Sequence, residues 1–332
     1  MSGNANQKIK LLYLADILRR YSDEQHPLTA PALCAHLQEY GISAERKSIY
    51  ADIHTLEDYG LDIIKTKTPA AGFFVASRQF ELPEIYLLCD AVQSAGFITP
   101  GKTRELIEKL GTLISCHQAK DLQKRVFIDT RAKCDNEEIY YNIDLLSRAV
   151  QQGKKVSLCY RNKYLSEGKI KYTTKTLEIS PYALMWENDH YYVVGNNAKY
   201  SNLMHLRLDR MKTVTILQDP VRPFTEVSKY RDFFDVADYQ KKTFSMFGGE
   251  LCGIELCCKE HLLDQVTDKF GQNLIFRRNS AQGTFTFSVN ALVSDGLVGW
   301  ILQFGADIEV KSPPALRQKI RDRLTTLQEL YK

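Results

Sequence analysis

The sequence lacks the features by which several protein classes are recognised. Its 332 residues contain no uninterrupted apolar run of the roughly 18 residues that a transmembrane helix requires. Residues 1–7 are polar and lack the apolar core of a secretion signal. The eight cysteines form no C-x-x-C pair and no cluster with histidine at zinc-ligand spacing. We therefore expect a cytoplasmic protein with no membrane partner and no bound metal.

Catalytic signatures are missing as well. None of the seven histidines lies in an H-E-x-x-H motif, and no G-x-S-x-G, P-loop or G-x-G-x-x-G sequence occurs. Asp52, Glu57 and Asp58 fall in a segment that we expect to be helical, and we interpret them as a solvated acidic flank. We expect no enzymatic activity, no catalytic residues and no cofactor.

Overall charge is nearly balanced, with 44 Lys and Arg against 40 Asp and Glu. Its distribution along the chain is uneven. Residues 1–80 carry nine basic and nine acidic side chains, whereas residues 154–218 carry eleven basic and five acidic ones. A local excess of that size can attract an anion, although solvated lysines are the more common explanation.

Residues 1–78 predict three helices followed by a β-hairpin. Apolar residues recur at helical spacing up to Arg20, and Thr29 and Pro31 begin a second helix that ends at Gly41. A third helix is expected from about Ser43 to Gly60, with two short strands after it. This order of elements is typical of a winged helix-turn-helix.

The third helix exposes a face that suits the DNA major groove. If Ile49, Ile53 and Leu56 are buried, the opposite side presents two cations, an aromatic ring and a histidine. A solvated helix face is the other interpretation, but the preceding helices and the hairpin lysines favour a duplex DNA interface. The predicted DNA-binding residues are Arg46, Lys47, Ser48, Tyr50, His54, Lys65 and Lys67.

The rest of the chain divides into four parts, which together make an α+β multidomain protein. Residues 79–138 are expected to be a helical connector whose apolar stripes serve core packing or subunit pairing. Residues 139–218 predict a short helix and several short strands, which cannot make a large core, so a small, strongly bent barrel is the economical solution. Residues 219–245 are a linker, and residues 246–332 alternate strands and helices as a small α+β domain.

Four motifs in order resemble one known family. The segment 46–53 resembles the recognition helix of winged-helix regulators that carry a WYL domain. Residues 180–186, 191–193 and 207–211 are similar to the three motifs of that middle domain, and Phe247, Phe270, Trp300 and Phe304 resemble the C-terminal extension called WCX. The resemblance covers nearly the whole chain.

The sequence departs from the family pattern at three places. Tyr191-Tyr192-Val193 stands where the family has Trp-Tyr-Leu, which keeps an aromatic pair. Ala51 replaces a frequent arginine and removes one possible DNA contact. Met204 replaces the first arginine of an Arg-x-x-Arg motif, which weakens the expected grip on phosphate.

The resemblance implies an Sm-like WYL barrel that senses a nucleotide or a nucleic-acid fragment. It also implies a dimer, so we expect a homodimer. Arginine forks bind phosphate and aromatic faces stack on bases, although each of these residues can equally be structural. The ligand-binding residues implied by the family are Tyr160, Arg161, Tyr182, Trp186, Tyr191, Tyr192, His205, Arg207 and Arg210.

Two functions are compatible with the sequence. The first is a ligand-responsive transcriptional regulator that binds an operator duplex through its winged helix and an effector through its barrel. The second is an accessory protein, for instance in phage defence, whose basic barrel binds RNA or single strands. Preference for duplex over single-stranded nucleic acid discriminates the two, because both modes depend on salt.

Overall fold

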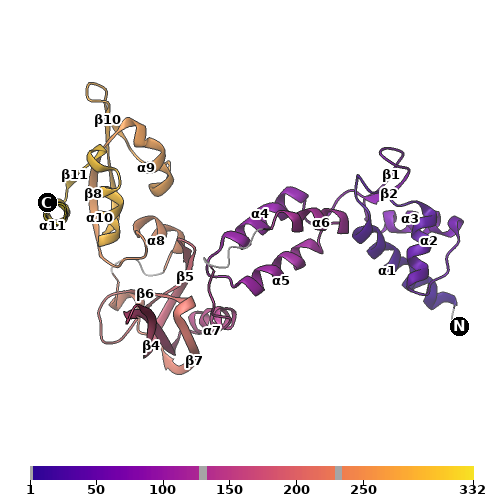
Figure 1. The fold of residues 1–332 in the computed structure, drawn as a ribbon, viewed down its shortest axis with the longest axis horizontal. Helices are drawn as coiled ribbons and strands as arrows, with labels where there is room; N and C mark the ends of the chain where they lie inside the picture. The colour runs from indigo at the N-terminus through magenta and orange to yellow at the C-terminus, as the bar shows by residue number, and fades with distance from the viewer. Residues whose placement is uncertain (1–2, 127–132, 229–233) are drawn as a thin grey trace. The chain divides into compact units, whose positions relative to one another are not determined.

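The computed structural model describes residues 3–126, 133–228 and 234–332, and it divides into two compact units, residues 1–135 and 136–332 (Figure 1). Both units mix helices with antiparallel sheets, so the predicted α+β class is confirmed. The structure does not describe residues 127–132 of the predicted helical connector or residues 229–233 of the predicted linker. The assignments as a winged helix-turn-helix and an Sm-like barrel stay predictions.

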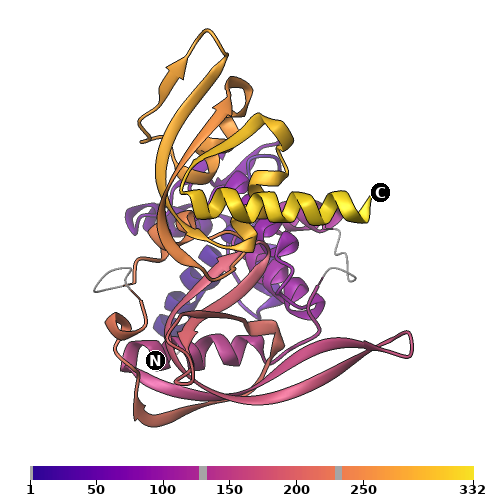
Figure 2. The same ribbon diagram turned by 90° about the vertical axis from the view of Figure 1, so that its left-hand side faces the viewer.

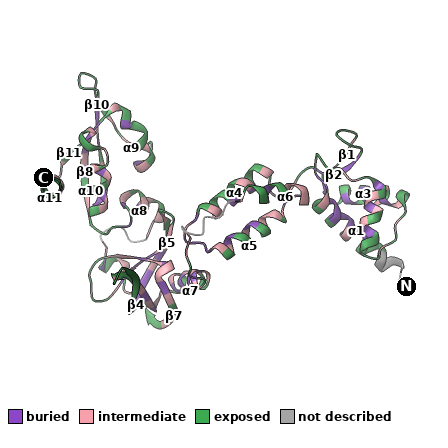
Figure 3. Ribbon diagram, in the orientation of Figure 1, coloured by how far each residue is buried: buried purple, intermediate pink, exposed green. Residues whose placement is uncertain are grey.

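The first unit begins with three helices and a two-stranded hairpin. These elements are α1 Gly3–Tyr21, α2 Ala30–Glu39, α3 Arg46–Asp58, β1 Ile63–Thr66 and β2 Gly72–Val75. The Thr29 hydroxyl caps α2 by accepting a hydrogen bond from the Ala32 amide. All four residues of β2 are buried (Figure 3), and Phe73 and Val75 join one apolar core with the inner faces of the three helices.

A close backbone approach fixes the hairpin to the segment before α2. Leu28 and Phe73 exchange two backbone hydrogen bonds of 2.8 Å each. A Cβ atom at Gly72 would lie 2.8 Å from the Leu28 carbonyl, so only glycine fits at this position. The predicted third helix begins at Arg46 rather than near Ser43, because Glu45 is extended.

Three further helices complete the first unit: α4 Leu82–Ser94, α5 Pro100–Gly111 and α6 Cys116–Lys124. They share an apolar core of their own. A polar seam joins them to the turn that follows α1. Ser115, the N-cap of α6, donates a short hydrogen bond to Asp23, and the rings of His26 and His117 stack with centroids 3.8 Å apart. Arg78 donates to the carbonyls of Arg19 and Ser22 at 2.7 and 2.6 Å.

The second unit begins with α7 Ile139–Gln152 and a five-stranded antiparallel sheet in the order β6-β5-β4-β3-β7. Its strands are β3 Lys154–Ser166, β4 Lys169–Glu187, β5 His190–Asn196, β6 Met204–Arg207 and β7 Met211–Pro220. Several short strands were predicted in this part of the chain, but β4 is a single long strand with an irregularity between Pro181 and Ala183. Within the described residues no ladder joins β6 to β7, so closure into a barrel is not confirmed.

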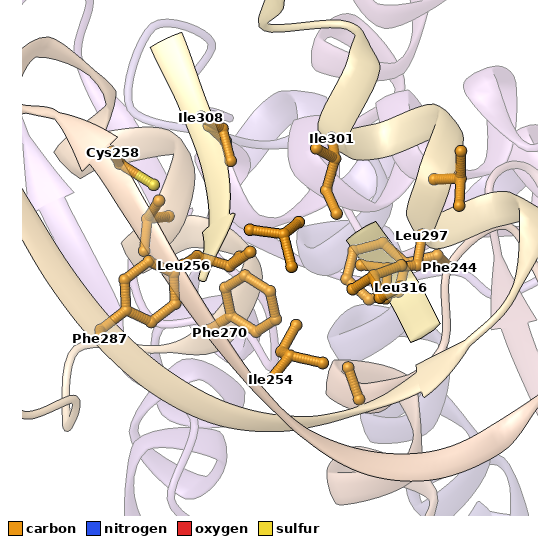
Figure 4. Packing of buried hydrophobic residues seen from close by; sticks show 14 of the residues in the cluster. Phe244, Ile254, Leu256, Cys258, Phe270, Phe287, Leu297, Ile301, Ile308 and Leu316 are labelled. Carbon is orange, nitrogen blue, oxygen red and sulfur yellow. The ribbon is translucent and has the colours of Figure 1, made fainter. Parts of the chain in front are cut away.

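The remaining elements form a second sheet with covering helices. After α8 Val236–Lys242, the elements are β8 Glu250–Lys259, α9 Leu263–Phe270, β9 Arg277–Asn279, β10 Thr284–Val293, α10 Asp295–Leu302, β11 Ile308–Ser312 and α11 Pro314–Leu330. The strand order β11-β8-β10-β9 is that of a ferredoxin-like split βαβ arrangement. Phe270 of α9 packs on Phe287 of β10 in its core, with ring centroids 5.6 Å apart (Figure 4).

Candidate nucleic-acid interface and ligand site

The outer face of α3 carries exposed cations at its N-terminal end. Ile49, Ile53 and Leu56 are buried as the spacing predicted, which leaves Arg46 and Lys47 exposed. The N-cap of α3 is Glu45, whose side chain caps none of the amides of the first turn. The first turn contains no acidic side chain, so the positive end of the helix dipole lies beside two cations.

The hairpin brings a further cation to the same surface. Arg46 Nη2 lies 3.4 Å from the Tyr50 hydroxyl, and Lys65 Nζ lies 5.6 Å from the centre of the Tyr50 ring. Lys65 is also 5.8 Å from the Phe73 ring of β2. The two exposed cations, which come from α3 and β1, therefore meet around one tyrosine. We call Arg46, Lys47, Tyr50 and Lys65 the α3 surface.

The other predicted DNA-binding residues lie around this surface with different contacts. Lys67 is exposed beyond the end of β1. Ser48 is half-buried, and its hydroxyl donates to the Glu45 carbonyl at 2.9 Å and accepts from Lys10 Nζ at 3.3 Å. His54 is exposed, and its Nδ1 lies 2.9 Å from the Glu57 carboxylate. The Ser48 hydroxyl is thus engaged within the protein, while Lys67 and His54 face solvent.

A buried ion pair beneath α3 corrects one interpretation of the sequence. Asp52 was expected on a solvated acidic flank, but its side chain is only 15% exposed and lies 2.6 Å from Lys10 Nζ. Lys10 itself is 7% exposed on α1. The burial of Lys10 could have been read from the sequence. Lys10 precedes the buried residues Leu14 and Ile17 by four and seven positions, which is the spacing of one helix face.

In the second unit, several of the predicted ligand residues gather around Asp209. A 3-10 turn, Leu208–Arg210, follows β6 and folds Asp209 back onto Arg207. The guanidinium donates to both carboxylate oxygens, with Nε–Oδ1 at 3.0 Å and Nη2–Oδ2 at 2.7 Å. The Arg207 amide donates to the Tyr160 hydroxyl at 3.3 Å, and the β5–β6 register places Tyr192 opposite Arg207. We call Tyr160, His190, Tyr192, Arg207, Asp209 and Arg210 the Asp209 cluster.

The electrostatics of the Asp209 cluster follow from burial and pairing. Burial alone would raise the pKa of Asp209, but the hydrogen bonds from Arg207 outweigh burial and lower the pKa. Burial raises the pKa of the Tyr160 and Tyr192 hydroxyls, so both stay protonated. His190, which the sequence analysis missed, has its pKa lowered by burial and by Arg207. Its Nδ1 is buried without a hydrogen-bond partner among the described residues.

The other predicted ligand residues do not all join this cluster. Tyr182 donates to the Arg222 carbonyl at 2.8 Å and packs edge-on against Phe224. His205 lies 3.0 Å from the Tyr239 hydroxyl, and burial lowers its pKa to about 4. Both residues are half-buried, and the Tyr182 hydroxyl and the His205 ring are engaged in contacts within the protein.

The remaining three predicted residues lie on β3, β4 and β5. Trp186 and Tyr191 face each other across the β4–β5 ladder, and Trp186 is 42% exposed. The Arg161 guanidinium lies 4.9 Å from the centre of the Tyr172 ring, and its Nε is buried with no hydrogen-bond partner in the described part of the chain. Arg161 thus belongs to the β3–β4 hairpin rather than to the Asp209 cluster.

The described residues contain neither a metal-binding group nor a helix that could cross a membrane. No group of three or more His, Cys, Asp or Glu side chains in 3–126, 133–228 and 234–332 is placed to hold a metal ion. Among those same residues, no helix combines the length and the apolar character needed to cross a membrane.

Comparison with known families identifies two domains of the second unit. The WYL domain family matches residues 141–216, which cover most of α7 and the five-stranded sheet, and the WCX domain family matches residues 254–328. The chain therefore contains a WYL domain followed by a WCX domain, as the resemblance of its motifs indicated.

Among curated proteins, the chain is similar to an uncharacterized HTH-type transcriptional regulator, YobV, of Bacillus subtilis (strain 168). The two are 23% identical over 297 residues, which are 86% of this chain and 89% of YobV. The alignment therefore extends well beyond the WYL and WCX domains into the N-terminal unit.

Two solved structures resemble the chain more distantly. Proteasome accessory factor B/C (PafBC) of Arthrobacter aurescens is 14% identical with a TM-score of 0.30, and a CRISPR Cas-related protein is 15% identical with a TM-score of 0.36. The matches cover 95% and 99% of this chain, but the chain spans only 47% of the PafBC chain, against 81% of the other. Both TM-scores are too low for either structure to bear on the function of this chain.

Proposed function

We propose that this protein is a ligand-responsive transcriptional regulator that binds duplex DNA through the α3 surface. The observation that carries the proposal is the meeting of Arg46 and Lys65 at Tyr50, which joins α3 to the hairpin in one cationic surface. The similarity to an HTH-type transcriptional regulator, which reaches into the N-terminal unit, supports it. The protein acts as a binding protein without enzymatic activity, and in the cytoplasm, where its DNA partner lies.

The geometry suits the winged helix-turn-helix mode of binding. A helix of the size of α3 fits the major groove, where Arg46 and Lys47 can reach guanine edges or phosphates. Lys65 and Lys67, carried by the hairpin, would then meet the flanking backbone as a wing does. The uncapped amides at the start of α3 add a further attraction for a phosphate.

The Asp209 cluster is the proposed effector site, and its ligand is a nucleotide or an oligonucleotide. The Arg207 fork is already occupied by Asp209, so an anionic ligand must displace that carboxylate or use Arg210 beside it. Tyr160 and Tyr192 place protonated hydroxyls next to the same arginine, and the half-buried Tyr192 also has part of its ring exposed. If a phosphate of the ligand took the place of the Asp209 carboxylate at Arg207, the bidentate geometry of the guanidinium would be preserved.

Regulation requires that the effector distinguish two arrangements of the protein. We propose that the protein is a homodimer and that helices α4–α6 change position when the effector binds. A ligand with equal affinity for both arrangements would shift nothing. Arg210→Gln should therefore weaken effector binding and leave the operator affinity of the effector-free protein unchanged.

The testing experiment captures sheared genomic DNA on the purified full-length protein and sequences the retained fragments. Arg46→Ala/Lys47→Ala is the test variant. Arg104→Ala/Lys109→Ala is the matched control, because it removes an exposed arginine and an exposed lysine from α5 of the same unit.

The proposal expects one or a few enriched duplex sites that the control variant retains and the test variant loses. Each lost base-edge contact should cost about 1–3 kcal/mol of binding free energy and relax specificity. Equal retention by all three proteins would remove α3 from the interface. Retention of single strands or RNA in preference to duplex would instead favour the accessory protein that the sequence also allows.

A further inference from the structure

The hairpin of β3 and β4 continues beyond the sheet as a two-stranded ribbon. The two strands stay paired to Ser166 and Lys169, but β7 pairs with β3 only as far as Tyr160 and β5 pairs with β4 only from Ser180. Figure 2 shows this ribbon projecting past the other strands of the sheet. We call residues 161–175 the arm.

The arm is exposed along almost its whole length, and its tip is apolar. Leu165 and Ile170 are directly paired across the ladder and are 75% and 64% exposed. The turn beyond them, Glu167-Gly168, has positive φ at both residues, 54° and 71°. Nothing within the described chain covers this aliphatic pair, and side chains this exposed belong to no buried core.

The stem of the arm is strongly basic. It carries five cations against one acidic residue, Glu167, which lies 3.2 Å from Lys171. Because side chains alternate between the two faces of a ribbon, both faces are basic. One face presents Tyr164, Lys169, Lys171 and Lys175, and the other presents Arg161, Lys163, Tyr172 and the apolar pair.

We propose that the arm is a second nucleic-acid contact, which grips duplex DNA independently of sequence. The lysines of the stem neutralise phosphates and release their counterions. A two-stranded ribbon fits a DNA groove, and an aliphatic pair at its tip is suited to act as a wedge at a base step. This inference rests on the proposed function in that duplex DNA is the partner in both. The arm contains none of the residues of the α3 surface.

The side chains of the arm favour a duplex over a single strand. Single strands are held by stacking of unpaired bases on aromatic rings. One face of the Tyr172 ring already carries the Arg161 guanidinium, at 4.9 Å, and the most exposed apolar side chains are aliphatic rather than aromatic. Aliphatic side chains cannot stack on a base, but they can open a base step.

The test measures binding of the full-length protein to a short fluorescent duplex of mixed sequence, between about 50 and 200 mM salt. The test variant is Lys163→Gln/Lys169→Gln/Lys171→Gln, and the control is Lys311→Gln/Lys319→Gln/Lys332→Gln. All six lysines are exposed, and each set contains one that is ion-paired, Lys171 with Glu167 and Lys311 with Glu309. Circular dichroism and the thermal midpoint verify that both variants are folded.

The arm variant should bind the duplex roughly tenfold or more weakly, and the slope of log affinity against log salt should fall by about 3. The control should match the parent protein. Leu165→Ser/Ile170→Ser should reduce bending of a duplex labelled at both ends, read by energy transfer. Unchanged bending in that variant would overturn the wedge, and an arm variant equal to its control would overturn the whole inference.

The α3 variant Arg46→Ala/Lys47→Ala separates this inference from the proposed function. If the α3 variant keeps its sites and the arm variant loses mixed-sequence affinity, the proposed function fails and the arm stands. If the α3 variant loses its sites and the arm variant keeps its mixed-sequence affinity, the inference about the arm is refuted and the proposed function stands. Loss of single-strand binding with duplex binding intact in the arm variant would refute the duplex assignment.

Discussion

The α3 surface and the Asp209 cluster are both cationic, yet they hold their charges in opposite ways. Arg46 and Lys65 lie around the Tyr50 ring, neither forms an ion pair with a carboxylate of the described residues, and both are exposed to solvent. Arg207, by contrast, is held by two hydrogen bonds to Asp209 in a half-buried site. The first arrangement can meet an incoming polyanion without displacing a carboxylate, whereas the second must first give up an internal partner.

This difference separates affinity from selectivity. An exposed cluster attracts any phosphate chain through counterion release, so its specificity must come from base edges. A cluster with an internal carboxylate rejects anions that cannot replace both hydrogen bonds of the arginine fork. Only the second arrangement suits a sensor that must ignore anions such as chloride, which cannot accept both hydrogen bonds of the fork in place of a carboxylate.

The largest effect on stability is expected at Lys10, the inward-facing cation beneath the α3 surface. Lys10→Met leaves Asp52 half-buried without its partner, and removal of one member of a buried pair costs about 3–5 kcal/mol of unfolding free energy. We expect the lower end, because the Asp52 side chain keeps some exposure. Urea unfolding measures the loss, and Lys8→Met, at an exposed position two residues earlier on α1, should leave stability unchanged. Equal stability of the two variants would contradict a structural role for the pair.

A second test concerns pH and the half-buried His205. Its pKa is lowered to about 4, so between that value and the ordinary 6.5 the unfolded chain binds a proton that the native protein does not. Stability therefore falls as pH drops from about 6.5 to 4, by about 3 kcal/mol from this group. His205→Gln should flatten that part of the profile, and parallel profiles for the parent and the variant would contradict it.

The third test compares substitution of the paired Arg207 with substitution of its neighbour Arg210. Arg207→Gln leaves the Asp209 carboxylate without its fork and should cost about 2 kcal/mol of unfolding free energy. The pKa of Asp209 should rise, since the hydrogen bonds that lower it are gone. The stability that this depressed pKa provides is present above about pH 4 and is lost as pH falls through the folded value, so the variant should lose less on acidification. Arg210→Gln is the matched control for charge, and an equal loss of stability there would contradict the pairing.

The smallest expected effect is at Tyr50. Tyr50→Phe keeps the ring beside Lys65 and removes only the 3.4 Å contact between the hydroxyl and Arg46. Operator affinity should change by a few tenths of a kcal/mol, within the range of an exposed polar contact. Tyr50→Ala should weaken binding further, by about 0.5–1 kcal/mol, because the ring no longer positions the two cations. Fluorescence anisotropy with the captured operator measures both, and a larger effect for Phe than for Ala would contradict the role of the ring.

The helices of both units were largely predictable, because their apolar spacing and caps are local signals. Thr29 and the buried stripe of α3 are examples. The Lys10–Asp52 pair was not predicted, since it joins residues 42 positions apart and a lysine on a buried face has no local signature of its partner. The pairing of Arg207 with Asp209 was missed for a different reason. It depends on the 3-10 turn that interrupts the strand pattern between β6 and β7.

The charges of α3 run against its own dipole. Arg46 and Lys47 stand at the positive N-terminal end and Glu57 and Asp58 at the negative C-terminal end, each at a cost of about 0.3–1 kcal/mol where it is exposed. A phosphate bound at the first turn would offset the unfavourable repulsion at the N-terminal end, because the cations, the positive end of the dipole and the uncapped amides all attract it. The helix thus gives up part of its own stability when alone, and its first turn is where amide hydrogen exchange should slow most when the protein meets DNA.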